Sequence, residues 1–376
     1  MPSSKLTKMP AFIKRFLLVL LFALSFSTGL FASYFYLNFS KVFIKTPKDV
    51  SLEDNASSNL PDGTYNILLL GYGGAGHDGG NLSDVIIVVN INPERKKLTL
   101  ISIPRDLWVE IPVRSDIKEK YKINAAYAIG SDDKKYPLKE PQYKGETGAG
   151  VMAKKVVTES IGLPIHYFLA VDFESFKKIV DTLGEIEVDV PVTFDDYFYP
   201  IKGRENDTCG KSAAEIARLH GLYSDTELHH QFECRYEHIH FDSGKVKMDG
   251  ETSLKFVRSR ASAQHGGDFA RSQRQQAVLV AMKSKLISIY AARKIDELFN
   301  EFGNLVRTDL DTSAVKDLSK ILGKPEDYKI SFIGLNEDNV LLASKSLDGQ
   351  FILIPKEGEG VLTGVHKFIF DELNKN

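Results

Sequence analysis

Residues 83–106 read SDVIIVVNINPERKKLTLISIPRD, and this stretch decides the fold. Two apolar runs, 84–91 and 97–103, flank the polar segment NPERK, which is the pattern of a hairpin of buried strands. Another short apolar run, at 65–70, comes before the hairpin. We therefore predict a sheet that starts with this run and is buried at its centre.

The rest of the chain predicts helices that cover this sheet. Apolar residues recur at helical spacing in several segments, and Asp172 can cap one of them. We expect helices at 148–161, 172–183, 249–258, 268–290, 312–322 and 361–373, and strands at 166–171, 328–333 and 350–354. This alternation indicates an α/β (α+β) fold, in which a central mixed β-sheet is covered by helices.

The composition indicates a globular protein and gives no reason to expect a nucleic-acid binder. The 376 residues include 48 Lys plus Arg and 50 Asp plus Glu, which gives a net charge of −2. Nucleic-acid binding usually leaves a basic excess, and this chain has none. A hydrophobic share of 43%, with 28 Gly and 2 Cys, excludes a collagenous chain, a disordered chain and a disulfide-stapled miniprotein.

The N-terminal segment predicts a transmembrane helix that anchors the chain. Residues 16–40 carry no charged side chain, and these 25 residues exceed the roughly 20 that span a bilayer. Four basic residues precede the run, and the positive-inside rule then places residues 1–15 in the cytoplasm. A cleaved signal peptide is the alternative, but its apolar region usually has about 7–15 residues. We expect a single-pass protein of the cell membrane, with a linker at 41–63 and an extracytoplasmic domain at 64–376.

Residues 195–243 look like an irregular excursion from the core. They hold five of the nine histidines and both cysteines, among clustered Asp, Tyr and Gly. An exported chain with two cysteines is expected to form one disulfide, here between Cys209 and Cys234. A zinc site of Cys234, His238 and His240 is the alternative, although the usual metal-ligand spacing is missing.

The segment GYGGAG at 71–76 spells GxGxxG after a strand. A dinucleotide site would need a helix to begin at these glycines, but the chain continues through HDGGNLSD into the hairpin. We instead expect a flexible loop whose polar end, with His77, Asp78 and Asp84, can approach a ligand. The alternative is a glycine-rich surface turn.

The segment SIPRD places Arg105 and Asp106 at the end of a buried strand. Strand ends and the loops after them are where sites on rigid scaffolds tend to lie. The alternative for such a pair is a surface ion pair.

Four arginines gather at 256–276, with Asp268 as the one acid among them. They are Arg258 and Arg260 in FVRSR, and Arg271 and Arg274 in DFARSQRQQ. Arg271, Arg274 and Gln275 share one helix face, in the first turns after a cap at Asp268. A helix N-terminus with forked guanidinium groups is an anion trap suited to phosphate. The alternative is a solvated basic face.

In their order along the chain, these motifs resemble the LytR-CpsA-Psr family of cell-wall glycopolymer transferases. The matching segments are NILLLGYGG, SDVIIVVNINPERKKLTLISIPRDLWV, KINAAYA, GLPIHYFLAVDFESFKKIVDTLGEIEVDV, MDGETSLKFVRSR and DFARSQRQQ. They cover about residues 64–290. The resemblance implies a membrane-anchored bacterial enzyme that joins a glycopolymer from an undecaprenyl-pyrophosphate carrier to peptidoglycan through a phosphodiester.

The resemblance also implies the site residues. The catalytic positions would be Arg105, Arg258, Arg260, Arg271 and Gln275. To these we add, from their place in the motifs, Asp106 as a candidate base and Arg274 and Asp268 as candidate contacts to substrate. Asp84 matches the family's metal-holding Asp, so Mg²⁺ is the expected cofactor. Gly73 stands where the family usually has another Asp, and residues 81–82 stand where it has Arg. We expect His77 and Asp78 to replace the missing carboxylate.

Two other classes of function would use the same residues. A polyprenyl-pyrophosphate phosphatase or pyrophosphatase would use the arginines and the metal with water as the nucleophile. A non-catalytic binder of anionic lipid or wall polymer would need the arginines but no metal. The partners expected of a transferase are the undecaprenyl-pyrophosphate-linked glycopolymer, peptidoglycan and the membrane, without nucleic acid.

Overall fold

The computed structural model describes residues 63–77, 79–291, 305–310, 314–315, 318, 321 and 324–375. The predicted membrane anchor at 16–40 and the loop residue Asp78 lie outside these ranges, as does most of the predicted helix at 312–322. Among the helices in the described ranges, none is both long and apolar enough to cross a bilayer.

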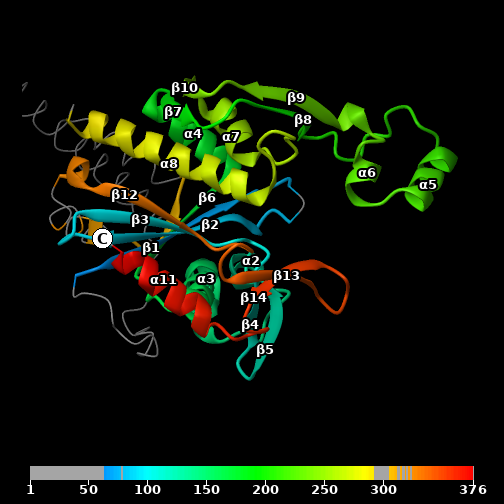
Figure 1. Cartoon of the computed structure of the whole chain (residues 1–376). Coiled ribbons are helices and arrows are strands. Elements are labelled where there is room, and N and C mark those ends of the chain that lie inside the picture. The colour runs from blue at the N-terminus through cyan, green and yellow to red at the C-terminus, as the bar shows by residue number, and fades with distance from the viewer. Residues whose placement is uncertain are drawn as a thin grey trace, which may run out of the picture.

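A six-stranded mixed sheet forms the centre of the molecule (Figure 1). Its strand order is β11-β6-β1-β2-β3-β12. The strands are β1 (Tyr65–Tyr72), β2 (Ser83–Asn92), β3 (Lys97–Ser102), β6 (Tyr167–Asp172), β11 (Arg307–Thr308) and β12 (Lys329–Gly334). β1, β2 and β3 pair antiparallel, whereas β6 runs parallel to β1 and β12 runs parallel to β3. The predicted central mixed sheet and its first hairpin are confirmed.

One face of this sheet is fully packed. Leu68, Val88 and Ile101 lie on this face and are all 0% exposed. They belong to a core shared with α3 (Gly145–Ile161) and α11 (Thr363–Asn374), which cover the face in Figure 1. Side chains alternate between the two faces of a strand. The residues directly before and after each of these three therefore point to the other face of the sheet.

A second core lies over that other side. It joins α4 (Phe173–Leu183), α7 (Gly250–Arg258) and α8 (Gly267–Ala291) to the small sheet of β7 (Ile186–Val190) and β10 (Gly244–Met248). Asp172 caps α4 by accepting a hydrogen bond from Ser175 N, as predicted, and Asp249 caps α7 in the same way. The central sheet therefore has one core on each side. A site can form where the second core does not fill the space above the sheet.

Shorter elements complete the fold. They are the hairpins of β4 (Trp108–Arg114) with β5 (Ile117–Lys122) and of β13 (Leu341–Lys345) with β14 (Phe351–Pro355), the helix α2 (Ala125–Ser131), and the 3-10 turns η1 (Pro141–Tyr143) and η3 (Pro325–Asp327). The strand β5 has the sequence IKEKYK and is mostly exposed. Such a strand has no apolar alternation, which is why the sequence did not predict it.

Residues 195–243 do leave the core as an excursion, but the prediction that the excursion is irregular is wrong. β8 (Phe194–Pro200) and β9 (Tyr236–Phe241) pair as an antiparallel ribbon that leads to α5 (Ala213–Leu222), α6 (Asp225–His229) and η2 (Glu233–Arg235). The ribbon extends away from the central sheet and holds α5 and α6 at its far end (Figure 1). A register shift between Asp196 and Tyr199 interrupts the alternation of β8, which hides the strand in the sequence.

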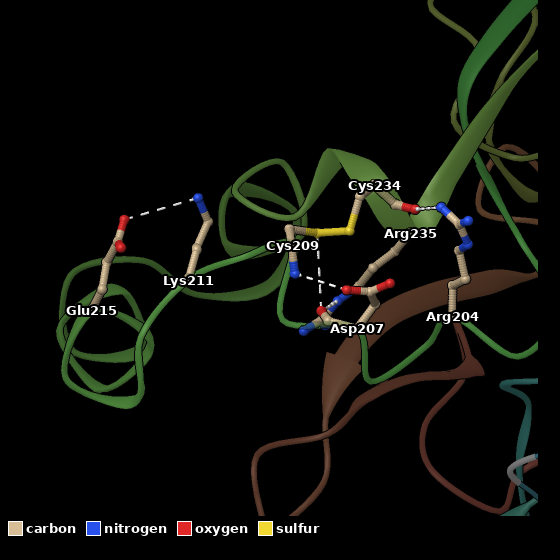
Figure 2. The surroundings of a disulfide bond; sticks show 7 residues. All are labelled: Arg204, Asp207, Cys209, Lys211, Glu215, Cys234 and Arg235. Carbon is tan, nitrogen blue, oxygen red and sulfur yellow. Dashed lines mark hydrogen bonds and ion pairs between the residues drawn. A yellow bond between two sulfur atoms is a disulfide. The ribbon is translucent and has the colours of Figure 1, made fainter.

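The predicted disulfide between Cys209 and Cys234 is present, with a Cα–Cα distance of 5.6 Å (Figure 2). Its surroundings are well hydrogen-bonded, because Asp207 accepts from Cys209 N and Arg204 donates to Cys234 O. Asp207 O also accepts a hydrogen bond from Arg235 Nε at 2.7 Å. A disulfide sulfur is not a thiolate ligand, so the alternative zinc site that used Cys234 does not form.

Candidate active site

A cavity of about 750 Å³ separates the two cores. The second face of the central sheet forms its floor, and α4 and α8 form its roof. Most of its walls are apolar, as with Leu69, Val89, Leu100 and Val171 from the sheet and Ile179 and Leu279 from the helices. We call this cavity the apolar slot. Its volume lies within the range of about 300–1,000 Å³ that is typical of ligand sites.

Neighbouring residues of β2 show how the sheet builds the slot. Val88 belongs to the packed core and is 0% exposed, whereas Val89 lines the slot and is only half-buried. The same alternation places Leu68 in the core and Leu69 in the slot. Both faces of the sheet are therefore apolar, but the protein fills only one of them. An apolar surface of this size favours a ligand with a hydrocarbon part.

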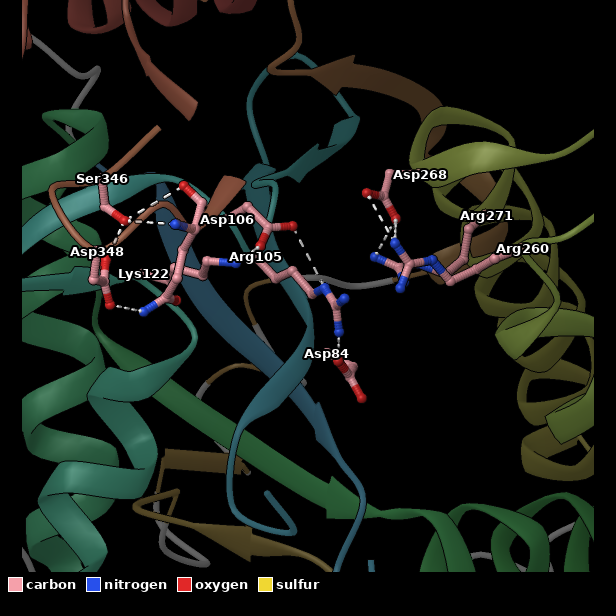
Figure 3. Close-up of polar contacts among 10 residues, drawn as sticks. Asp84, Arg105, Asp106, Lys122, Arg260, Asp268, Arg271, Ser346 and Asp348 are labelled. Carbon is pink, nitrogen blue, oxygen red and sulfur yellow. Dashed lines mark hydrogen bonds and ion pairs between the residues drawn. The ribbon is translucent and has the colours of Figure 1, made fainter. Parts of the chain in front are cut away.

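Several lining residues of the slot are charged or polar. They include Asp84, Arg105, Arg258, Arg260, Arg271 and Gln275, and we call the part of the slot that these residues line its mouth. Arg105 follows β3, Arg258 is the last residue of α7, and Arg271 lies in the first turns of α8. In Figure 3, Arg105 and Asp84 lie opposite Arg260 and Arg271. The structure thus brings the predicted catalytic arginines and Gln275 to one cavity.

Arg105 is held by two carboxylates. Its Nη1 lies 2.5 Å from Asp84 Oδ1, and its Nε lies 3.5 Å from Asp106 Oδ2. Burial opposes the charge, but Asp84 and Asp106 outweigh burial and raise the pKa of the guanidinium. Asp106 is itself buried, does not line the slot, and pairs with Lys122 at 2.7 Å. Asp106 therefore contacts Arg105 from behind rather than facing the slot as a general base would.

Asp268 joins the two arginines on the opposite side of the mouth. Its Oδ1 lies 2.8 Å from Arg271 Nη2 and 3.1 Å from Arg260 Nη2. Asp268 is not among the residues that line the slot, and its ion pairs orient the two arginines. Burial lowers the pKa of Arg271 to about 10, which leaves it charged at neutral pH. Two cations share one carboxylate, so this side keeps a positive charge.

Arg258 is held by aromatic rings. Its guanidinium carbon lies 4.5 Å from the centre of the Phe173 ring and 5.5 Å from that of Tyr199. It also donates a hydrogen bond to Tyr199 Oη at 3.2 Å. Within the described part of the chain, Arg258 forms no ion pair with a carboxylate. The two rings therefore orient its charge.

The glycine-rich loop leads from β1 into β2, so it does not start the helix that a dinucleotide site needs. His77 in this loop packs edge-on against Phe173, with ring centroids 5.3 Å apart. Burial, followed by the charges of Arg258 and Lys202, lowers the pKa of His77. His77 does not line the slot, and its predicted partner Asp78 lies outside the described residues.

The donor set at the mouth fits Mg²⁺ only together with a bound phosphate. Asp84 lines the slot and shares Oδ1 with Arg105. Gly73 supplies no carboxylate, and a Cβ atom there would lie 3.0 Å from His77 Cβ, so a larger residue at this position would need His77 to shift by a few tenths of an ångström. Among the described residues, the one group of three candidate ligands surrounds the disulfide and does not include Asp84. Mg²⁺ commonly takes one or two carboxylates and completes its shell with water and phosphate oxygens.

Arg274 does not face the slot, contrary to the prediction from helical spacing. It is 0% exposed, and its guanidinium donates to the carbonyl oxygens of Phe256, Ser259 and His265. Burial lowers its pKa to about 10. Arg271 and Arg274 share one side of α8, but α7 packs over Arg274 and leaves only Arg271 at the mouth. Arg274 is therefore a structural residue and not a substrate contact.

Two carboxylates that line the slot were not predicted as site residues. Asp172 accepts a hydrogen bond from Ser175 N at 2.7 Å, so its sequence signal is that of a helix cap. Asp196 lies on β8 and is 1% exposed. Asp196 could have been identified as an acid that shares the inward face of a strand with aromatic residues. That pattern can be seen only once β8 is recognised as a strand.

Comparisons with known proteins agree with this architecture. A model described as the LytR_cpsA_psr family matches residues 33–357. The polyisoprenyl-teichoic acid–peptidoglycan teichoic acid transferase TagU of Enterococcus faecalis is 25% identical over 343 residues, which cover 90% of each chain. The protein of the same name from Oceanobacillus iheyensis is 28% identical over 253 residues, 67% of this chain. The chain spans 61% of the length of that relative.

A solved structure shares the fold. The crystal structure of TagV from Bacillus subtilis superimposes with a TM-score of 0.54 at 24% identity. The superposition covers 84% of this chain and 100% of that chain. At this identity the likeness supports the α+β architecture with its central mixed sheet.

Proposed function

The chain belongs to the LytR-CpsA-Psr family, and from that membership we propose that it transfers a glycopolymer from an undecaprenyl-pyrophosphate carrier to peptidoglycan. The apolar slot with arginines at its mouth is the observation that carries this proposal. A soluble sugar phosphate would use the arginines but leave the slot empty. A polyprenyl diphosphate has both parts that the site asks for: a hydrocarbon chain that suits the apolar slot, and an anionic headgroup that suits the arginines. The names of the TagU relatives describe a donor and an acceptor of this class, which supports the proposal.

The slot would bind the isoprenoid chain through the hydrophobic effect. Each buried methylene group contributes about 0.8 kcal/mol, so a long chain gains affinity along the whole slot. Val89 on the floor and Leu279 on the roof would contact it from opposite sides. The lipid thereby fills the space that separates the two cores.

The arginines would bind the diphosphate and stabilise its transfer. Guanidinium groups hold phosphate oxygens through paired hydrogen bonds, and Arg105 and Arg271 lie opposite each other at the mouth. An acceptor hydroxyl oxygen bonds to the phosphorus that carries the polymer, and the bond from that phosphorus to the bridging oxygen breaks. Polyprenyl phosphate leaves with the bonding electrons, and the hydroxyl proton passes to solvent. Fixed cations stabilise the charge that develops on the leaving phosphate.

Mg²⁺ belongs to this proposal as a cofactor held by Asp84 and the phosphate oxygens of the substrate. Bound there, it would add positive charge beside Arg105 and Arg271. Asp84→Asn removes the metal carboxylate and also a partner of Arg105. The expected result is turnover that responds less to added Mg²⁺, with Mg²⁺ titrated against turnover in both proteins. An unchanged Mg²⁺ dependence would argue against Asp84 as a ligand.

The predicted anchor at 16–40 would place this domain on the outer face of the cell membrane, next to lipid-linked substrate. A reporter enzyme that works only after export, fused behind Asn376, tests this topology. Activity of the fusion supports an extracytoplasmic domain. Activity of a fusion that works only in the cytoplasm would contradict it and the wall-assembly function with it.

The assay that tests the reaction uses the full chain in detergent, a radiolabelled lipid-linked glycopolymer and peptidoglycan. The proposal predicts label that sediments with peptidoglycan and polyprenyl phosphate as the second product. Free phosphorylated polymer formed without peptidoglycan would instead show a pyrophosphatase. Tight binding of the lipid with no product would show a non-catalytic binder.

A further inference from the structure

The turn at residues 258–261 carries two arginines of the slot, and we call it the arginine turn. Three of its donors, one hydroxyl and two backbone N–H groups, converge on one buried carboxylate oxygen. Ser259 Oγ lies 2.7 Å from Asp196 Oδ2, and the backbone N–H groups of Arg260 and Ala261 both donate to the same oxygen at 3.1 Å. Asp196 is 1% exposed, so water cannot replace it as the acceptor.

A buried cation holds the same turn from the other side. The guanidinium of Arg274 donates to Ser259 O within the turn, and to Phe256 O and His265 O on either side of it. The Asp196 carboxylate thus accepts from the donors of the arginine turn, and the Arg274 guanidinium donates to the acceptors in and beside it. Asp196 also favours the charged form of Arg274, which burial alone disfavours. Each buried charge is compensated by the other and by the backbone between them.

This arrangement fixes the direction of two side chains that reach the slot. Arg258 ends α7, and Arg260 follows two residues later in a segment with no regular structure of its own. The path of the backbone between them decides where both guanidinium groups point. Cations that are oriented before the ligand arrives bind an anion without a further ordering cost.

We propose that Asp196 is a positioning residue of the anion site, which acts on the diphosphate headgroup of a polyprenyl lipid through Arg258 and Arg260. The proposal rests on the proposed function for the nature of the ligand, and it assigns a part of the site to β8. The ribbon that leaves the core at β8 is therefore a component of the site, because its inward-facing carboxylate holds the arginine turn.

Asp196→Asn tests this with little change in volume. Both oxygens of Asp196 accept hydrogen bonds, since Phe198 N donates to Oδ1 at 2.9 Å. An asparagine amide therefore meets a donor with its NH₂ group in either orientation. Asp195→Asn is the matched control, because Asp195 lies on the same strand, faces outward and accepts from His238 and His240.

The measurement is binding to the full chain in detergent of two probes, polyprenyl phosphate and the uncharged polyprenol of equal length. We expect Asp196→Asn to weaken the binding of polyprenyl phosphate about tenfold, which corresponds to the loss of one charged hydrogen bond. The binding of polyprenol should not change. Asp195→Asn should bind both probes like the wild type. Equal weakening of both probes would mean a general loss of structure, and no weakening of either would mean that Asp196 does not act on the anion site. Both results overturn the proposal.

A double-mutant cycle with Arg260→Ala identifies the path of the effect. If Asp196 acts through the arginine turn, Asp196→Asn should cost less affinity in the Arg260→Ala background than in the wild type. Full additivity contradicts the proposal. Ser259→Ala removes one donor and keeps both charges, so it gives a milder variant if Asp196→Asn does not fold, and it should weaken only polyprenyl phosphate. Wild-type protein that binds lipid phosphate but transfers no polymer would refute the proposed reaction and leave this positioning role measurable.

Discussion

At the scale of single residues, Arg271 and Arg274 show that residue type and spacing alone do not determine the role of a residue. Both lie on one side of α8, three positions apart. Arg271 meets Asp268 at the mouth of the slot, whereas Arg274 donates only to buried groups. The sequence predicted that both would meet the ligand, Arg271 as a catalytic residue and Arg274 as a substrate contact, because helical spacing does not show that the neighbouring helix α7 packs over Arg274.

The two arginines should therefore respond differently to the same substitution. Arg271→Lys keeps the charge but loses the forked pair of donors, so we expect about tenfold weaker binding of polyprenyl phosphate and little change in stability. Arg274→Lys leaves buried carbonyl groups without donors, each at a cost of about 1–3 kcal/mol, and should lower the free energy of unfolding by about 2–4 kcal/mol. Urea unfolding and lipid binding of both variants give the comparison. Equal destabilisation of the two proteins would contradict this division of roles.

His240 on the outer face of the ribbon should titrate above its usual pH. The ring donates hydrogen bonds to Asp195 and Asp242, and these bonds, the one to Asp195 first, raise the pKa of its imidazole. A raised pKa in the folded state means that the pair stabilises the ribbon below the unfolded pKa of about 6.5, and that this effect is lost as the pH rises through the folded value. An NMR titration of the ring protons measures it. Asp195→Asn should lower the pKa of His240 more than Asp242→Asn does, and the reverse order would contradict the assignment.

At the scale of elements, the sequence correctly predicted the strands and helices that have a strong apolar pattern. The hairpin at 84–103, the strand at 166–171 and the capped helix at 172–183 are confirmed, because their buried faces are wide and regular. The ribbon was missed, since the inward residues of β8 are interrupted by a bulge and its outward residues are acidic or aromatic. Of the site, the arginines were recognised by type, but Asp196 depends on that missed strand.

The far end of the ribbon should depend on its disulfide. Leu219 is the one buried residue of α5, so this end has little core of its own. The bond between Cys209 and Cys234 closes a separation of 25 residues, and the chain-entropy model gives it about 3.5 kcal/mol. The double variant Cys209→Ser and Cys234→Ser should exchange amide hydrogens faster in α5 and α6 and leave the central sheet protected. Hydrogen exchange with mass spectrometry resolves the two regions, and faster exchange in β1 to β3 would contradict a local role.

At the scale of the whole molecule, the slot is a gap between two cores, and the sequence does not reveal it. Strands β1, β2 and β3 are apolar on both faces, which is also the pattern of a sheet that is packed on both sides. Whether the second face meets helices directly or across a cavity depends on how far α4 and α8 stand from the sheet. That distance is set by contacts among the helices, the small sheet and the ribbon, which lie far apart in the sequence.

Two neighbouring valines of β2 test this organisation. Val89→Trp places a large ring in the slot, where it packs on apolar walls, so we expect stability to stay equal or rise while the affinity for polyprenol falls. Val88→Trp forces the same ring into the filled core and should lower the free energy of unfolding by about 1–3 kcal/mol or more. Unfolding by urea and binding of polyprenol, measured on both proteins, compare the two faces with one residue type on one strand. If Val89→Trp were destabilised as much as Val88→Trp, the second face would be packed in solution and the slot would not be available to a lipid. If Val89→Trp were stable and still bound polyprenol like the wild type, the hydrocarbon chain would have to lie elsewhere.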